Sequence, residues 1–177
     1  MIVKLVDTSN PLLHQECQAF DFENPQVDPH KLVEDLADTM AHNRGVGLSA
    51  NQVGYNLKVF VMGNPDKPED VFTVFNPKIV DYGEEVMLAE EGCLSYPGLY
   101  VKIKRSTNIR VRFSNAMGDT NTVNLTGFDA RVFQHEYDHM MGVSHTSRAS
   151  NFHLNQAKRQ QKKLQKLRKR NGANLSV

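Results

Sequence analysis

The residues best suited to chemistry form one short segment, His135-Glu136-Tyr137-Asp138-His139. Residues four apart on a helix project from the same face, so the two imidazoles could bind one metal ion. Glu136 stands beside the first histidine and could accept a proton from a water molecule that this ion activates. The pattern therefore predicts a metal-dependent hydrolase. The simpler interpretation is a surface helix that happens to carry two histidines and a glutamate.

A catalytic ion with two histidine ligands needs a third protein ligand, and the chain offers two candidates. His145 completes the longer pattern HExxHxxGxxH of the metzincin proteases, but those enzymes also need a downstream methionine turn. No methionine follows Met141. The other candidate is Cys93, within Glu91-Gly92-Cys93-Leu94-Ser95. A lone cysteine is more often a small buried apolar residue than a ligand, so its spacing alone does not decide the question.

A third segment of interest is residues 45–52, Gly-Val-Gly-Leu-Ser-Ala-Asn-Gln. Its two glycines allow the backbone to approach a ligand closely, and it ends in the amide side chain of Gln52. By itself, such a segment is most simply a helix cap followed by a loop.

Taken together and in this order, the three segments resemble the peptide deformylase family, whose motifs are GxGxAAxQ, EGCLS and QHExDH. The second motif matches completely at residues 91–95 and the third at residues 134–139. The first motif departs at Ser49, where the family usually has alanine. The resemblance covers about residues 28 to 148, and the matches at Cys93 and Gln52 favour it over the protease interpretation.

The resemblance implies a role for each matching residue. Cys93, His135 and His139 would be the metal ligands, and Glu136 the acid/base residue. Gln52 and the backbone N–H of Leu94 would form the oxyanion hole. The implied reaction is hydrolysis of the N-formyl group from the leading methionine of nascent peptides, with release of formate. The family usually carries iron(II) and accepts zinc, nickel or cobalt.

The resemblance also assigns residues to the substrate pocket. The backbone of Val46 and Gly47 would pair with the main chain of the peptide, as an added strand does. Phe128 and Val132 would enclose the methionine side chain, although Phe128 could equally be a plain core residue. Arg131 would lie exposed near the pocket mouth. His145 occupies a position that is usually apolar in the family. We expect it to be exposed, with contact to a metal ligand as the alternative, and not to bind metal itself.

The elements that must position these residues follow from the residue pattern. An N-terminal helix is predicted over about 29–43, starting with Asp28 as its cap and Pro29 at its first position. A mostly antiparallel sheet region is predicted next, with strands over 58–62, 71–75, 100–103, 109–113 and 122–125. Helical patterns return over about 129–141 and 151–170. The expected fold class is α+β, with mostly antiparallel sheets packed around a central HExxH helix.

Length and composition limit the alternatives. With 177 residues, the chain is expected to form one catalytic domain over 1–150 and a basic extension over 151–177. It has no secretory signal and no run of eighteen apolar residues, which predicts a cytoplasmic protein without a membrane segment. Its two cysteines, Cys17 and Cys93, are therefore expected to stay reduced.

The charges are divided unevenly along the chain. No acidic residue follows Asp138, whereas nine of the 21 lysines and arginines do; the preceding residues hold 12 basic and 20 acidic side chains, a balance of −8. The extension resembles the C-terminal segment with which some bacterial deformylases bind the ribosome. Its basic residues could contact RNA phosphates, or they could form only a solvated helix face.

Overall fold

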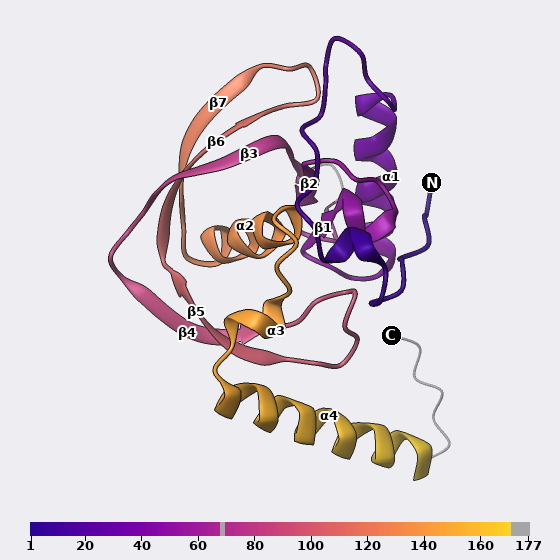
Figure 1. Ribbon diagram of the computed structural model, residues 1–177, viewed down its shortest axis with the longest axis vertical. Helices are drawn as coiled ribbons and strands as arrows, with labels where there is room; N and C mark the ends of the chain where they lie inside the picture. Colours follow the sequence, from indigo (N-terminus) through magenta and orange to yellow (C-terminus); the bar gives the residue numbers. More distant parts are fainter. Residues whose placement is uncertain (68–69, 171–177) are drawn as a thin grey trace.

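The chain forms a mixed fold of helices and antiparallel strands in a computed structural model that describes residues 1–67 and 70–170 (Figure 1). One sheet has five strands in the order β1-β2-β3-β6-β7, and a second sheet pairs β4 with β5. All of these pairings are antiparallel. The strands are β1 (Gly47–Ser49), β2 (Val59–Met62), β3 (Phe72–Tyr82), β4 (Val86–Glu91), β5 (Val101–Ser106), β6 (Asn108–Ser114) and β7 (Thr120–Thr126). The predicted α+β class is confirmed.

Within the described residues, four α-helices accompany the sheets. They are α1 (Pro29–His42), α2 (Gly127–Met140), α3 (His145–Arg148) and α4 (Asn151–Arg170), and short 3-10 helices occupy Pro11–Leu13 and Ala50–Val53. In Figure 1, α2 lies within the curve of the long strands, whereas α4 lies at the periphery. None of the helices in the described ranges is both long and apolar enough to cross a membrane.

Helix α1 begins where the sequence predicts. The carboxylate of Asp28 accepts a hydrogen bond of 2.7 Å from the backbone N–H of Lys31, and Pro29 occupies the first turn. The buried stripe of the helix packs against strands β1 and β2 in one core cluster, through Leu32, Leu36, Met40, Leu48 and Val61. This packing fixes the start of the 45–52 segment relative to the sheet.

Helix α2 is buried along most of its length, and this explains how it can hold a site inside the protein. Phe133 packs edge-to-face on Phe60 of β2, with ring centroids 5.1 Å apart. Ala130, Phe133 and Met140 are all fully buried in the same core cluster. The apolar stripe therefore faces the five-stranded sheet, and His135 lies against Glu91 at the end of β4 in the second sheet.

Strand β5 shows why the second sheet contributes charge to the interior. Its side chains alternate between inside and outside, as expected for a half-buried strand. Val101, Ile103 and Arg105 are buried, and the intervening Lys102 and Lys104 are exposed. The alternation brings a guanidinium group into the interior beside α2.

Sequence reasoning missed two strands. It overlooked β1, which has only three residues, and β4, whose Val86, Met87 and Leu88 are all largely exposed. A strand with no inward-facing apolar alternation lacks the periodic signal that predicts strands. It also ended β3 at residue 75, seven residues too early.

The C-terminal helix packs against the body through its first half. Ala157 is buried with Leu99 and Val101, and Leu154 packs against the same cluster. The side chains described beyond Gln161 are exposed. The final residues of the predicted extension, 171–177, lie outside the described residues.

Candidate metal centre and active site

Three side chains that are distant in sequence converge beside α2. The candidate ligand atoms of Cys93, His135 and His139 all lie within 4.8 Å of one another. The Sγ atom of Cys93 lies 3.2 Å from Nε2 of His139. Both histidines lie on one face of α2, and Cys93 follows β4, which ends at Glu91. Within residues 1–67 and 70–170, this is the one group of acidic, cysteine and histidine side chains arranged to hold a metal ion.

His145 is not part of this group, and the expectation that it would be exposed is wrong. Its side chain is buried, with its ring centroid 5.3 Å from that of Tyr96 and 5.8 Å from that of His135. Its Nε2 atom lies 3.4 Å from the carbonyl oxygen of Leu99. The ring therefore fills space behind the site, and the third member of the ligand group is the cysteine.

The donor set fits a divalent transition metal. A thiolate and two imidazoles suit iron(II), zinc, nickel and cobalt better than calcium or magnesium. The Nδ1 atom of His135 lies 3.1 Å from Oε2 of Glu91. Such an interaction fixes the tautomer of a metal-bound histidine and directs its other nitrogen to the ion. Burial lowers the pKa of His139 well below its usual value, which favours the neutral form that binds metals.

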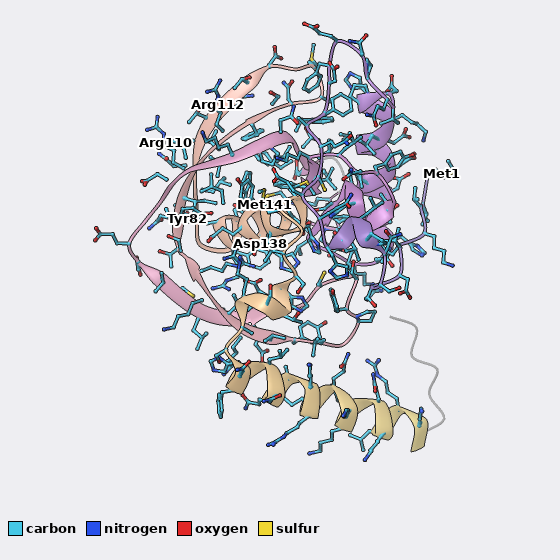
Figure 2. The ribbon with its side chains drawn as sticks, in the orientation of Figure 1. Met1, Tyr82, Arg110, Arg112, Asp138 and Met141 are labelled. Atoms are coloured by element: carbon cyan, nitrogen blue, oxygen red, sulfur yellow. The ribbon has the colours of Figure 1, made fainter. Side chains whose placement is uncertain are left out.

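Glu91 belongs to a buried network of charges that sequence reasoning did not predict. Arg105 donates two hydrogen bonds of 2.9 Å to this carboxylate and one of 2.6 Å to Oδ2 of Asp138. Arg148 donates a further bond of 2.6 Å to Oδ1 of Asp138. Burial alone would raise the pKa of Glu91, but Arg105 and His135 hold it well below its usual range. In Figure 2, Asp138 lies inside the fold, whereas Arg110 and Arg112 of β6 point outwards.

Glu136 lies on the same helix, inside the protein and beside the ligand group. Its Oε2 atom accepts a hydrogen bond of 2.6 Å from the hydroxyl of Ser49. Burial raises the pKa of Glu136, and His135 and Ser49 oppose this change. A buried carboxylate with a raised pKa can both accept and return a proton near neutral pH.

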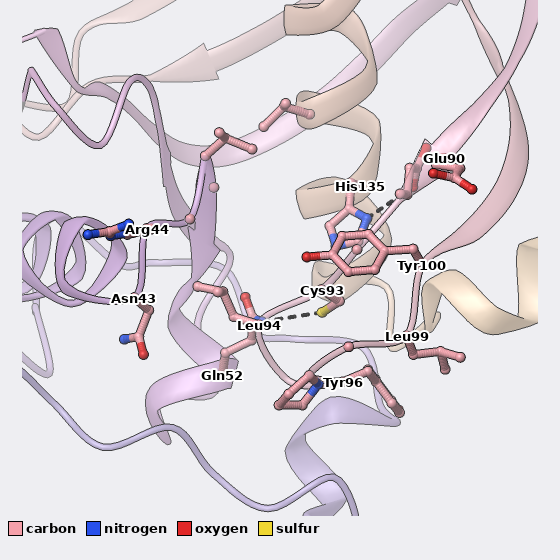
Figure 3. Close-up of a pocket in the computed structure, with 18 of the residues that line it drawn as sticks. Asn43, Arg44, Gln52, Glu90, Cys93, Leu94, Tyr96, Leu99, Tyr100 and His135 are labelled. Atoms are coloured by element: carbon pink, nitrogen blue, oxygen red, sulfur yellow. Dashed lines mark hydrogen bonds and ion pairs between the residues drawn. The ribbon is translucent and has the colours of Figure 1, made fainter. Parts of the chain in front are cut away.

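The 45–52 segment surrounds this carboxylate closely. A Cβ atom at Gly47 would collide with Oε1 of Glu136 and would lie 2.8 Å from its Cδ atom. Only glycine fits at this position without displacing the carboxylate. The amide of Gln52 is also fixed: its Oε1 accepts from the backbone N–H of Ser49 at 2.9 Å. Its Nε2 donates to Oγ of Ser95 at 3.0 Å. The same nitrogen lies 3.7 Å from Sγ of Cys93 (Figure 3).

Comparison with known proteins decides the family. A family model described as polypeptide deformylase matches residues 2–155. The chain belongs to the peptide deformylase family.

Individual relatives agree with this assignment. The chain is 46% identical to the peptide deformylase of Thermotoga petrophila over 113 residues, which cover 64% of this chain and 67% of that protein. It is 36% identical to the Aquifex aeolicus peptide deformylase over 172 residues, which cover 96% and 100% of the two chains.

Solved structures of the family share the fold. The crystal structure of the Thermotoga maritima peptide deformylase superimposes with a TM-score of 0.78 at 36% identity, covering 85% of this chain and 99% of that one. A plant peptide deformylase 1B superimposes with a TM-score of 0.83 at 30% identity, covering 97% and 94%.

The deformylase pocket opens in front of the ligand group. The cavity has a volume of about 570 Å³. Residues of both sheets, of the loop after α1, of the segment after Cys93, and of helices α2 and α4 line it. Its lining includes all of the residues to which sequence analysis assigned a place around the substrate or the oxyanion, namely Val46, Gly47, Gln52, Leu94, Phe128 and Val132. Val132 is buried, whereas Phe128 is 63% exposed and therefore not a core residue.

The expectation that Arg131 would be exposed is also wrong. It lines the cavity but is buried rather than exposed. Its guanidinium donates to Oε1 of Glu91 at 2.7 Å and to the carbonyl oxygens of Ile103 and Met87. Arg131 therefore joins α2 to both strands of the second sheet and belongs to the charge network behind the ligand group.

Proposed function

We propose that this deformylase hydrolyses the N-formyl group from the leading methionine of nascent peptides and releases formate. The observation that carries this proposal is the position of Glu136, whose buried carboxylate lines the same cavity as Cys93 and His135. A formyl group in this cavity would have a candidate base and three candidate metal ligands within reach.

We propose that Cys93, His135 and His139 hold one divalent ion. Iron(II) is our first choice, because the family usually carries it and a mixed sulfur and nitrogen donor set suits it; zinc, nickel and cobalt suit the same donors. When bound, such an ion supplies Lewis-acid activation of the attacking water and of the formyl carbonyl.

Glu136 would carry the proton through the reaction. Its carboxylate takes a proton from water as the water oxygen bonds to the formyl carbon, and it returns the proton to the nitrogen as the C–N bond breaks. The products are formate and a peptide with a free amino group. The Nε2–H of Gln52 and the backbone N–H of Leu94 would stabilise the charge that develops on the formyl oxygen.

The peptide would bind along β1. This strand stands at the edge of the five-stranded sheet, with β2 as its one neighbour in that sheet, so its other edge is available to an added strand. Val46 and Gly47 lie at this edge and line the cavity. Phe128 and Val132 would enclose the methionine side chain opposite them.

The test is a formate-release assay on a formyl-methionyl peptide with metal-loaded protein. Glu136→Ala and Cys93→Ser should each lower the rate by at least about 100-fold, the usual contribution of a general base or more. His145→Ala, which changes a buried histidine outside the ligand group, is the matched control and should retain activity. Full activity in both of the first two variants would refute the proposed function.

We further propose that the outer face of α4 binds ribosomal RNA, which would place the enzyme in the cytoplasm near its substrates. Among the α4 side chains that the structure describes, seven lysines or arginines are exposed. Three of them, Arg159, Lys163 and Lys166, lie opposite the face that carries Ala157. Changing these three to glutamate should weaken ribosome pelleting at low salt and leave formate release intact. Equal pelleting of the two proteins would refute ribosome binding by α4.

The division between a catalytic domain, 1–150, and an extension, 151–177, stays a prediction.

A further inference from the structure

The cavity in front of the ligand group continues as far as the C-terminal helix. Leu164 and Arg168 of α4 line it together with Cys93 and Glu136. A cavity of about 570 Å³ is large enough for a ligand of several groups. A formylmethionine would fill only part of this volume, and the remainder is bounded by α4 and the segment after Cys93.

Helix α4 is held in this position by specific contacts. Ala157 packs against Leu99 and Val101, and Leu154 joins the same cluster. One turn further along, Nε2 of Gln161 donates a hydrogen bond of 2.9 Å to the carbonyl oxygen of Pro97. Pro97 itself lines the cavity. The contacts with the body thus extend along α4 to the cavity rim.

Leu164 and Arg168 continue the face of α4 that makes these contacts. Positions 154, 157, 161, 164 and 168 are spaced by three or four residues and therefore form one stripe along the helix. Leu164 is 49% exposed, so it is not a core residue. Its position on the stripe turns it to the cavity instead.

The side of the cavity formed by α4 carries different charges at its two ends. Glu90 lies near the first half of α4, in a small hollow that it shares with Lys102 and Gln160, so that negative and positive charges balance there. Arg168 lies two turns beyond Gln160, about 12 Å along the helix axis. Among the residues that the structure describes, Arg168 is exposed and makes no ion pair. A carboxylate brought into the cavity at this end would meet an uncompensated positive charge.

We propose that Leu164 and Arg168 form a subsite for the residues that follow the methionine of a formylated peptide, in which Leu164 contacts apolar atoms and Arg168 pairs with a carboxylate. The subsite rests on the proposed deformylase function and defines its substrate class. The face of α4 that carries Leu164 and Arg168 would then bind the substrate. The opposite face, with Arg159, Lys163 and Lys166, points away from the cavity and would bind RNA.

The experiment compares formyl-methionyl peptide amides that carry glutamate or lysine at the second, third, fourth or fifth position. At one of these positions, the wild type should prefer glutamate in kcat/KM by about two- to fivefold, the range that an exposed ion pair supports. Arg168→Glu should reverse this preference, and added salt should reduce it. Lys163→Glu, with the same charge change on the outer face, should keep the wild-type preference. Leu164→Ser should raise KM for long peptides and leave formyl-Met-Ala unchanged.

The outcomes separate the subsite from the underlying function. Formate release with the same glutamate-to-lysine ratio in the wild type and Arg168→Glu would overturn the subsite while the deformylase function stands. Equal shifts in Arg168→Glu and Lys163→Glu would also overturn it, because they would reflect net charge alone. No formate from any peptide would overturn both proposals.

Discussion

The hydroxyl of Ser49 donates a 2.6 Å hydrogen bond to the carboxylate of Glu136 within the protein interior. Ser49 is the one position at which this chain departs from the first deformylase motif. A buried hydroxyl needs a partner, and here the partner is the candidate acid/base residue. The hydroxyl that distinguishes Ser49 from the usual alanine is therefore satisfied by the carboxylate proposed to transfer the proton.

Ser49→Ala should destabilise the protein and shift its pH dependence. The buried carboxylate of Glu136 loses a hydrogen-bond donor, so we expect a loss of about 1–3 kcal/mol in the free energy of unfolding. The hydroxyl lowers the pKa of Glu136, so its removal should move the acid limb of the pH–rate profile to higher pH. Because the family usually has alanine here, formate release should persist. Ser147→Ala, at an exposed serine, should change neither quantity.

Gly47→Ala should damage catalysis more than folding. The added Cβ would lie 2.8 Å from Cδ of Glu136 and would displace the carboxylate. A displacement of about 1 Å in a catalytic group can cost about 100-fold in rate, so formate release should fall by about that factor. Gly63→Ala, whose nearest Cβ contact would be the carbonyl oxygen of Asp70 at 3.2 Å, is the control. A rate for Gly47→Ala within a few-fold of that control would contradict the steric argument.

Arg105→Ala should be strongly destabilising at neutral pH. It leaves Glu91 and Asp138 buried without their shared cation, and breaking such a pair costs about 3–5 kcal/mol. Arg110→Ala, at an exposed position of β6, should cost less than about 0.5 kcal/mol. Urea unfolding monitored by circular dichroism measures both changes.

The Arg105→Ala deficit should also depend on pH. In the native protein, the pKa of Glu91 is held below its usual range, so this carboxylate stabilises the fold above its unfolded pKa and loses that contribution as the pH falls. In the variant, Arg131 and His135 still contact Glu91, but the loss of Arg105 raises the pKa of this carboxylate relative to the native protein, and the variant loses less stability on acidification. The stability difference between the two proteins should therefore narrow as the pH falls below about 4. A constant difference, measured with a chelator in both samples, would contradict this assignment.

The sequence predicts the parts of the site that depend on local spacing. The i, i+4 histidines, the cap at Asp28 and the stripe of α1 are local features, and the structure has each of them. The placement of Cys93 beside the histidines follows from the family resemblance. No local pattern predicts contact between residues 46 positions apart, as Cys93 and His139 are.

The charge network was missed because it depends on tertiary contacts. Arg105 is buried by the alternation of β5, whereas the strand predicted from the sequence ends at residue 103. The EGCLS motif by itself gives Glu91 no role, although a carboxylate two residues before a candidate ligand could orient a neighbouring histidine. His145 and Arg131 were expected at the surface because their burial depends on Tyr96, on Glu91 and on the carbonyl groups of the second sheet.

The most direct test of the central claim is the metal content of purified protein, measured by elemental analysis after dialysis against excess divalent ion and then against buffer. The wild type and His145→Ala should each retain one ion per chain, whereas Cys93→Ser and His139→Ala should retain far less. One ion per chain in Cys93→Ser, together with its loss in His145→Ala, would contradict the ligand assignment.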